Sequence, residues 1–115
     1  MSELQANLSE EDGIFVLRIS GELDYKGVEP FRKALEDVFD KPDGLILECS
    51  GVEYICSAAM GVLIKYVNQS RQAGKKVVLT GVSDNDKIRN PINAVGLSKL
   101  VTIADNLDKA KQMFR

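Results

Sequence analysis

The chain has 115 residues, of which 44% are apolar and 28% are charged, and its formal net charge is −2. This length and composition predict one globular domain with a single modest core, spanning residues 1–115. The charge offers no basic face to nucleic acid, and the absence of histidine removes the usual general base and zinc ligand. We therefore expect no nucleic-acid partner, no metal and no cofactor. Most active-site arrangements of small enzymes are excluded, although catalysis as such is not.

The N-terminal segment predicts a β-hairpin. Apolar and polar residues alternate over residues 4–8, which is typical of a half-buried edge strand. The turn dipeptide Asp12-Gly13 separates this strand from a second one over residues 14–20. We expect Gly21-Glu22-Leu23-Asp24 to end the second strand in a polar loop.

A helix and a central strand follow. Apolar residues recur with a helical period over residues 28–39, and Pro30 is tolerated in a first turn. Pro42-Asp43-Gly44 is expected to stop this helix. Residues 45–49 are apolar on both faces, as in a buried parallel strand. Residues 50–54 are more polar and are expected to form a loop.

The next helix is expected to run from Ser57 to about residue 73. Ser57 would lie at its N-terminus, where a serine hydroxyl can cap free backbone N–H groups and where an anion is tolerated. The inward stripe of this helix consists of Met60, Leu63, Ile64 and Val67. Gly74 is typical of a helix C-terminus, and residues 75–80 predict another buried strand.

The C-terminal third predicts two more helices and a short strand. A capping sequence at residues 83–86 precedes a helical pattern in which Pro91 predicts a kink or a restart capped by Asn90. Residues 100–103 predict a strand and residues 105–114 an amphipathic helix. The side chains expected to point inward from this last helix are Leu107, Ala110 and Phe114.

Strands and helices alternate after the opening hairpin, which predicts the α/β class. We expect a mixed β-sheet of about five strands with about four helices. No apolar stretch approaches the roughly 20 residues that a membrane span needs, and the first residues lack the features of a signal peptide. We therefore expect a cytoplasmic protein without membrane insertion.

Three segments of this α/β chain resemble STAS domains: Gly21-Glu22-Leu23-Asp24, residues 52–63 (VEYICSAAMGVL) and Val95-Gly96-Leu97. Within that family, the chain is most similar to stand-alone bacterial anti-sigma factor antagonists. The resemblance implies a single STAS-like domain that switches partners. Its unphosphorylated form would bind an anti-sigma factor that is also a GHKL-type serine kinase, and would so free a sigma factor. Phosphorylation by that kinase would break the complex, and a metal-dependent Ser/Thr phosphatase would reset it.

The resemblance also implies the site. By motif position the phosphorylated serine falls on Ser57, and Asp24 falls in a loop near the phosphorylation site and the kinase surface. The family usually reads Asp-Ser-Ser/Thr-Gly-Leu-Gly where this chain has CSAAMG over residues 56–61, so the serine is kept and its neighbours differ. The predicted partner-binding residues are Asp24, Tyr25, Tyr54, Cys56, Ser57, Ala58 and Met60. The same resemblance implies a monomer that is not an enzyme.

Other interpretations of these residues stay open. The chain could be a STAS regulatory subunit of a transporter or of a multi-protein sensor complex. It could also be a small thiol enzyme using Cys56, since a helix N-terminus lowers a thiol pKa, although no histidine is present to assist it. Cys49 is expected in the core. Asp24 could simply end a strand or cap the following helix, and Tyr25 and Tyr54 could be interface anchors or ordinary packing residues.

Overall fold

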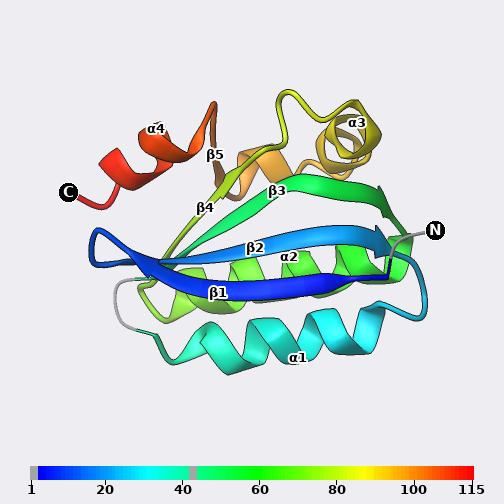
Figure 1. Cartoon of the computed structure of the whole chain (residues 1–115), viewed down its shortest axis with the longest axis horizontal. Helices are drawn as coiled ribbons and strands as arrows, with labels where there is room; N and C mark the ends of the chain where they lie inside the picture. Colours follow the sequence, from blue (N-terminus) through cyan, green and yellow to red (C-terminus); the bar gives the residue numbers. More distant parts are fainter. Residues whose placement is uncertain (1–2, 42–43) are drawn as a thin grey trace.

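The computed structural model describes residues 3–41 and 44–115, which form a twisted sheet with helices on both sides (Figure 1). The strands in these residues are β1 (Gln5–Glu11), β2 (Ile14–Leu23), β3 (Gly44–Ile55), β4 (Lys76–Thr80) and β5 (Thr102–Ala104). The helices are α1 (Val28–Phe39), α2 (Ser57–Gln72), α3 (Asp86–Ala94), α4 (Leu107–Gln112) and the short 3₁₀ helix η1 (Leu97–Lys99). The predicted α/β class, with its mixed sheet of five strands and its four α-helices, is confirmed for the described part of the chain.

The sheet has the strand order β1-β2-β3-β4-β5. β1 pairs with β2 in the antiparallel sense, and the other neighbours are parallel. Alternate strand residues face opposite sides: Leu45 and Leu47 join the larger core cluster with α1, α2 and α3, whereas Ile46 joins a smaller cluster under α4. No helix in the described residues is long and apolar enough to cross a membrane.

The two central strands are longer than predicted. β2 continues to Leu23 and β3 continues to Ile55, so the loop expected at residues 50–54 is wrong. The two extensions pair with each other across register shifts. Gly51 allows this close approach, because a Cβ there would lie 2.8 Å from the Cβ of Ser20. Because the register is irregular, Val52 and Ile55 both point into the core although they are three residues apart. The sequence of this segment therefore lacks the two-residue alternation that is typical of a strand.

Smaller differences occur at both ends of the chain. The face expected to be half-buried in the first strand is only partly covered: Leu4 packs against the core, whereas Ala6 is exposed and Leu8 is 42% exposed. Pro91 lies inside α3 without a restart at Asn90, since a proline removes only one hydrogen bond from so short a helix. β5 begins two residues and ends one residue later than predicted, and Val95 is exposed. The stop expected at Pro42 and Asp43 lies outside the described residues.

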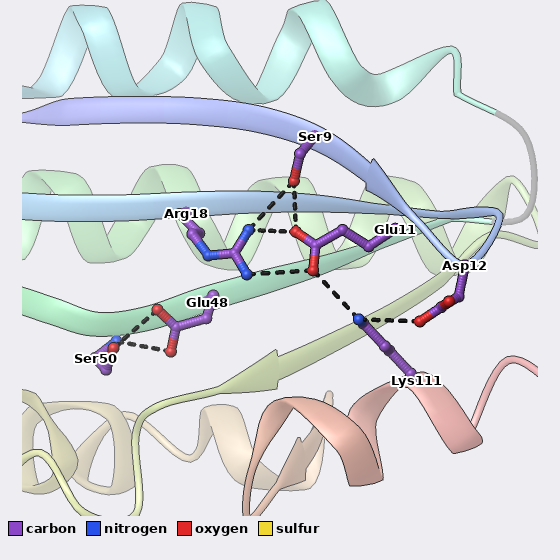
Figure 2. Close-up of polar contacts among 7 residues, drawn as sticks. All are labelled: Ser9, Glu11, Asp12, Arg18, Glu48, Ser50 and Lys111. Atoms are coloured by element: carbon purple, nitrogen blue, oxygen red, sulfur yellow. Dashed lines mark hydrogen bonds and ion pairs between the residues drawn. The ribbon is translucent and has the colours of Figure 1, made fainter.

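A polar network fastens the C-terminal helix to the hairpin (Figure 2). The Arg18 guanidinium and the Ser9 hydroxyl donate to the Glu11 carboxylate, Ser9 at 2.6 Å. Lys111 of α4 reaches Glu11 and Asp12, both at 3.2 Å. Above all the hydrogen bond from Arg18, followed by those from Ser9 and Lys111, lowers the pKa of Glu11 to about 2. The ionised carboxylate therefore links β1, β2 and α4.

We predict that Glu11→Gln destabilises the protein at pH 7. A carboxyl group whose pKa is lowered by folding contributes stability above its unfolded pKa, and that contribution is lost as pH falls through the folded value. The difference in unfolding free energy between wild type and variant should therefore be full near pH 7 and shrink between about pH 4.5 and pH 2. Denaturant unfolding across this range measures it. A difference that does not change with pH would contradict the ionic origin of the effect.

Candidate functional site

Ser57 is the first residue of α2, and its side chain is exposed. The residue in the N-cap position is Cys56, whose backbone is extended (φ −86°, ψ 167°) and whose thiol makes no capping hydrogen bond. The prediction that the Ser57 hydroxyl caps this helix is therefore wrong. Because Ser57 lies one residue inside the helix, its hydroxyl stands on the surface and is not used by the fold.

The start of α2 is a favourable place for a phosphate. The first helical hydrogen bond runs from the Met60 N–H to the Cys56 carbonyl at 3.0 Å, so the N–H groups of the preceding residues have no acceptor within the helix. The first turn contains no acidic residue that would offset the helix dipole. A dianion on Ser57 would be stabilised there by about 0.3–1 kcal/mol.

Strand pairing brings the Asp24 turn beside this helix start. Leu23 is the register partner of Ile55, and the Cys56 N–H donates to the Leu23 carbonyl at 2.8 Å. The chain therefore leaves β2 and β3 side by side, at the right-hand end of the sheet in Figure 1. The Asp24 carboxylate accepts from the N–H groups of Lys26 and Gly27 at 3.0 and 3.1 Å, so it shapes the turn that leads into α1.

Most of the other predicted partner-binding residues share this surface. Tyr25 is 78% exposed and Tyr54 is 51% exposed, so neither side chain is buried in the core. Ala58 is exposed and Cys56 is partly buried. We call this set the Ser57 surface; its members are Asp24, Tyr25, Tyr54, Cys56, Ser57 and Ala58. Met60 does not belong to it, because its side chain is only 5% exposed and packs in the core.

A groove between α1 and α2 was not foreseen. It has a volume of about 1040 Å³, begins beside the Ser57 surface at Ala58 and extends to Ala73. Its α2 wall includes Ala58, Gly61 and Val62, which are small residues at helical spacing. In the sequence, these residues lie on the helix face opposite the apolar stripe, and their spacing is the only local feature that indicates the groove. The groove gives the Ser57 surface a concave continuation between two helices.

Asn85 was foreseen only as part of a capping sequence. Its side-chain oxygen caps α3 by accepting from the Lys87 N–H at 3.1 Å. Its amide nitrogen donates to carbonyls of β3, at 3.1 Å to Cys49 and 2.8 Å to Val52. Asn85 therefore supports the strand extension that carries Tyr54 and Cys56 to the surface. Nothing in the local sequence identifies these distant acceptors.

Neither cysteine is disulfide-bonded. Cys49 is a core residue as predicted, and burial raises the pKa of its thiol to about 12. Cys56 has no histidine to assist it, since the chain contains none. In the described residues, no group of three or more His, Cys, Asp or Glu side chains could hold a metal ion.

We predict that Cys56→Asp stabilises the protein. The backbone at this position already has the extended conformation of an N-cap, and aspartate is a preferred cap residue. Adding the missing acceptor should raise the free energy of unfolding by about 0.5–2 kcal/mol, measured by urea denaturation. Cys56→Ala is the control, since it also removes the thiol but adds no acceptor. Equal stabilities of the two variants would contradict this description of the helix start.

The sequence of this chain is similar to those of known proteins over nearly its whole length. The STAS domain profile matches residues 5–110. The anti-sigma-F factor antagonist RsfB of Mycobacterium tuberculosis is 28% identical over 108 residues, covering 93% of this chain and 86% of that protein. An anti-sigma F factor antagonist of Paenibacillus polymyxa is 23% identical over 105 residues, covering 90% and 88%.

A solved structure agrees over the same length. The crystal structure of an anti-sigma factor antagonist from Mycobacterium paratuberculosis superposes with a TM-score of 0.83 at 27% identity. The match covers 98% of this chain and 95% of that one. The likeness therefore includes the hairpin, the sheet and all four α-helices described above.

Proposed function

This chain belongs to the STAS domain family, and on that premise we propose that it is an anti-sigma factor antagonist whose binding is switched off by phosphorylation of Ser57. The relatives that it matches nearly end to end include anti-sigma factor antagonists. We further propose that the anti-sigma factor is itself a GHKL-type serine kinase and that a Ser/Thr phosphatase resets the switch. Because these partners act on transcription, the chain would work in the cytoplasm. The family resemblance implies that it does so as a monomer and without catalysis of its own.

The observation that carries this proposal is the exposed, unused hydroxyl of Ser57 at an uncapped helix start. A kinase needs a serine that it can reach, and a regulated protein must tolerate the phosphate afterwards. The free N–H groups at the start of α2 favour a negative charge, so the modified domain should keep its fold. The phosphate would therefore act on the complex.

The geometry of the Ser57 surface supports such an effect. The phosphate would add about −1.5 to −2 charge at pH 7 at the meeting point of two segments that each carry an exposed tyrosine. Exposed tyrosines are frequent anchors of protein interfaces. A dianion on Ser57 would have to be desolvated on binding, and any acidic group of the partner would repel it. Cys56 stands where the resembling family usually has an aspartate, so the unphosphorylated site has one acidic side chain fewer and the phosphate changes its charge from a less negative starting value.

The proposal is tested with purified components. The chain is titrated with each GHKL-type anti-sigma factor of the source organism, with and without its bound sigma factor. We expect one of them to bind and to release its sigma factor, and to add a single phosphate to Ser57 when ATP is supplied, as located by peptide mass spectrometry. Binding without phosphorylation would support the proposed role as an antagonist but would contradict the proposal that the anti-sigma factor is the kinase for Ser57. Binding to none of them would overturn the proposal and favour a STAS subunit of a transporter or sensor complex.

A further inference from the structure

A second polar site lies where β4 and β5 end and β3 continues. The crevice there has a volume of about 310 Å³ and lies between the starts of α3 and α4. Its lining includes three carboxylates, those of Glu48, Asp84 and Asp105, and no lysine or arginine. The crevice lies outside the carboxyl ends of β4 and β5. It shares no lining residue with the Ser57 surface.

Thr80 provides an independent indication of a ligand. It is the last residue of β4, it lines the crevice, and it is only 1% exposed. Its hydroxyl oxygen has no hydrogen-bond partner among the described residues. A buried hydroxyl without a partner costs about 1–3 kcal/mol and is uncommon in native proteins. A bound group with an N–H donor would satisfy it.

The negative charge of the crevice is only partly balanced by the protein. Glu48 accepts from the N–H and the hydroxyl of Ser50, at 3.2 and 2.8 Å, and both donors are neutral. Arg18 is the register partner of Glu48 on β2 and its charge interacts with that carboxylate, but its hydrogen bonds go to Glu11 and Ser9 (Figure 2). Lys109 pairs with Asp105 at 3.2 Å. Glu48 and Asp84 therefore remain without a described ion pair.

We propose that this crevice binds a guanidinium group. A guanidinium presents a planar fork of N–H donors that matches a carboxylate with two hydrogen bonds, and it has further donors for the hydroxyl oxygen of Thr80. A directly ligated metal fits less well, because no cluster of three or more His, Cys, Asp or Glu side chains in the described residues could hold one. The group can belong to a free small molecule or to an arginine side chain of a protein.

The test is a titration followed by amide NMR spectra of the ¹⁵N-labelled chain. The probes are agmatine, the tripeptide Gly-Arg-Gly, and putrescine as an amine without a guanidinium. We expect agmatine or the tripeptide to cause saturable shifts at Thr80, Gly81 and Asn106, and putrescine to cause smaller ones. Agmatine binding more tightly would indicate a small molecule, and the tripeptide binding more tightly would indicate a protein arginine.

Variants separate this site from general electrostatics. Thr80→Val and Asp84→Asn should each weaken binding by at least about tenfold, and Thr80→Val should not lower the melting temperature, because it removes an unpaired buried hydroxyl. Glu36→Gln, in the groove between α1 and α2, should leave binding unchanged. Shifts that do not saturate, an equal response to putrescine, or unchanged affinity in both crevice variants would overturn the proposal.

Discussion

Phosphorylation of Ser57 is expected to weaken binding of the anti-sigma factor by about 100-fold or more, which corresponds to about 2.7 kcal/mol. The expected loss arises in the interface, where a dianion must be desolvated and would be repelled by any acidic group of the partner. It does not arise in the domain, because the start of α2 offers free N–H groups and no competing acid. Affinity should therefore fall while the melting temperature stays the same or rises slightly.

Isothermal titration of the phosphorylated and unphosphorylated chains measures this effect. Ser57→Ala should bind like the wild type, since the hydroxyl has no role in the fold. Ser98→Glu is the matched control, because it places a negative charge on another exposed serine, in η1, away from the Ser57 surface. The proposed switch would be contradicted if the phosphorylated chain bound with unchanged affinity. It would also be contradicted if the circular dichroism spectrum showed that phosphorylation unfolds the chain.

Asn85→Asp is expected to lower the free energy of unfolding by about 1–3 kcal/mol, although it replaces one good cap residue by another. The new carboxylate can still accept from the Lys87 N–H. Its second oxygen, however, takes the place of the amide nitrogen that donates to the carbonyls of Cys49 and Val52. Those carbonyls lose their donor and face a negative charge. Thermal and urea unfolding measure the loss.

Asn106→Asp is the matched control for this variant. Asn106 caps α4 by accepting from the Lys109 N–H at 2.8 Å, and its amide nitrogen makes no hydrogen bond within the described residues. The same substitution there should change stability by no more than about 0.5 kcal/mol. Equal effects of the two substitutions would show that Asn85 acts only as a helix cap.

The sequence predicted those elements of the fold that have a regular local pattern, and it missed those that depend on pairing with a distant strand. The helical period predicted over residues 28–39 coincides with α1, because the apolar residues of that segment recur every 3.6 residues without interruption. The extension of β3 was missed, because Val52 and Ile55 are three residues apart and break the alternation of a strand. Their inward direction comes from the shifted pairing with β2, which no local pattern contains.

The site was predicted less completely, for a similar reason. Asp24 and Ser57 were associated through the family resemblance, and their proximity depends on the parallel pairing of Leu23 with Ile55. Met60 received two conflicting predictions, one as an inward residue of the apolar stripe and one as a surface residue of the motif. Its burial agrees with the stripe. Periodicity within one helix was thus the better guide to where a side chain points.

The most direct test of the central claim is to locate the bound anti-sigma factor on the chain. Amide NMR spectra of the ¹⁵N-labelled protein would be recorded with and without the unlabelled partner. We expect the largest changes at residues 24–26 and 54–58, with little change at Gly81 and Asn106 in the crevice on the other side of β3. Changes confined to α4 and the β1–β2 hairpin, with the signals around Ser57 unmoved, would contradict the claim that Ser57 lies in the binding surface.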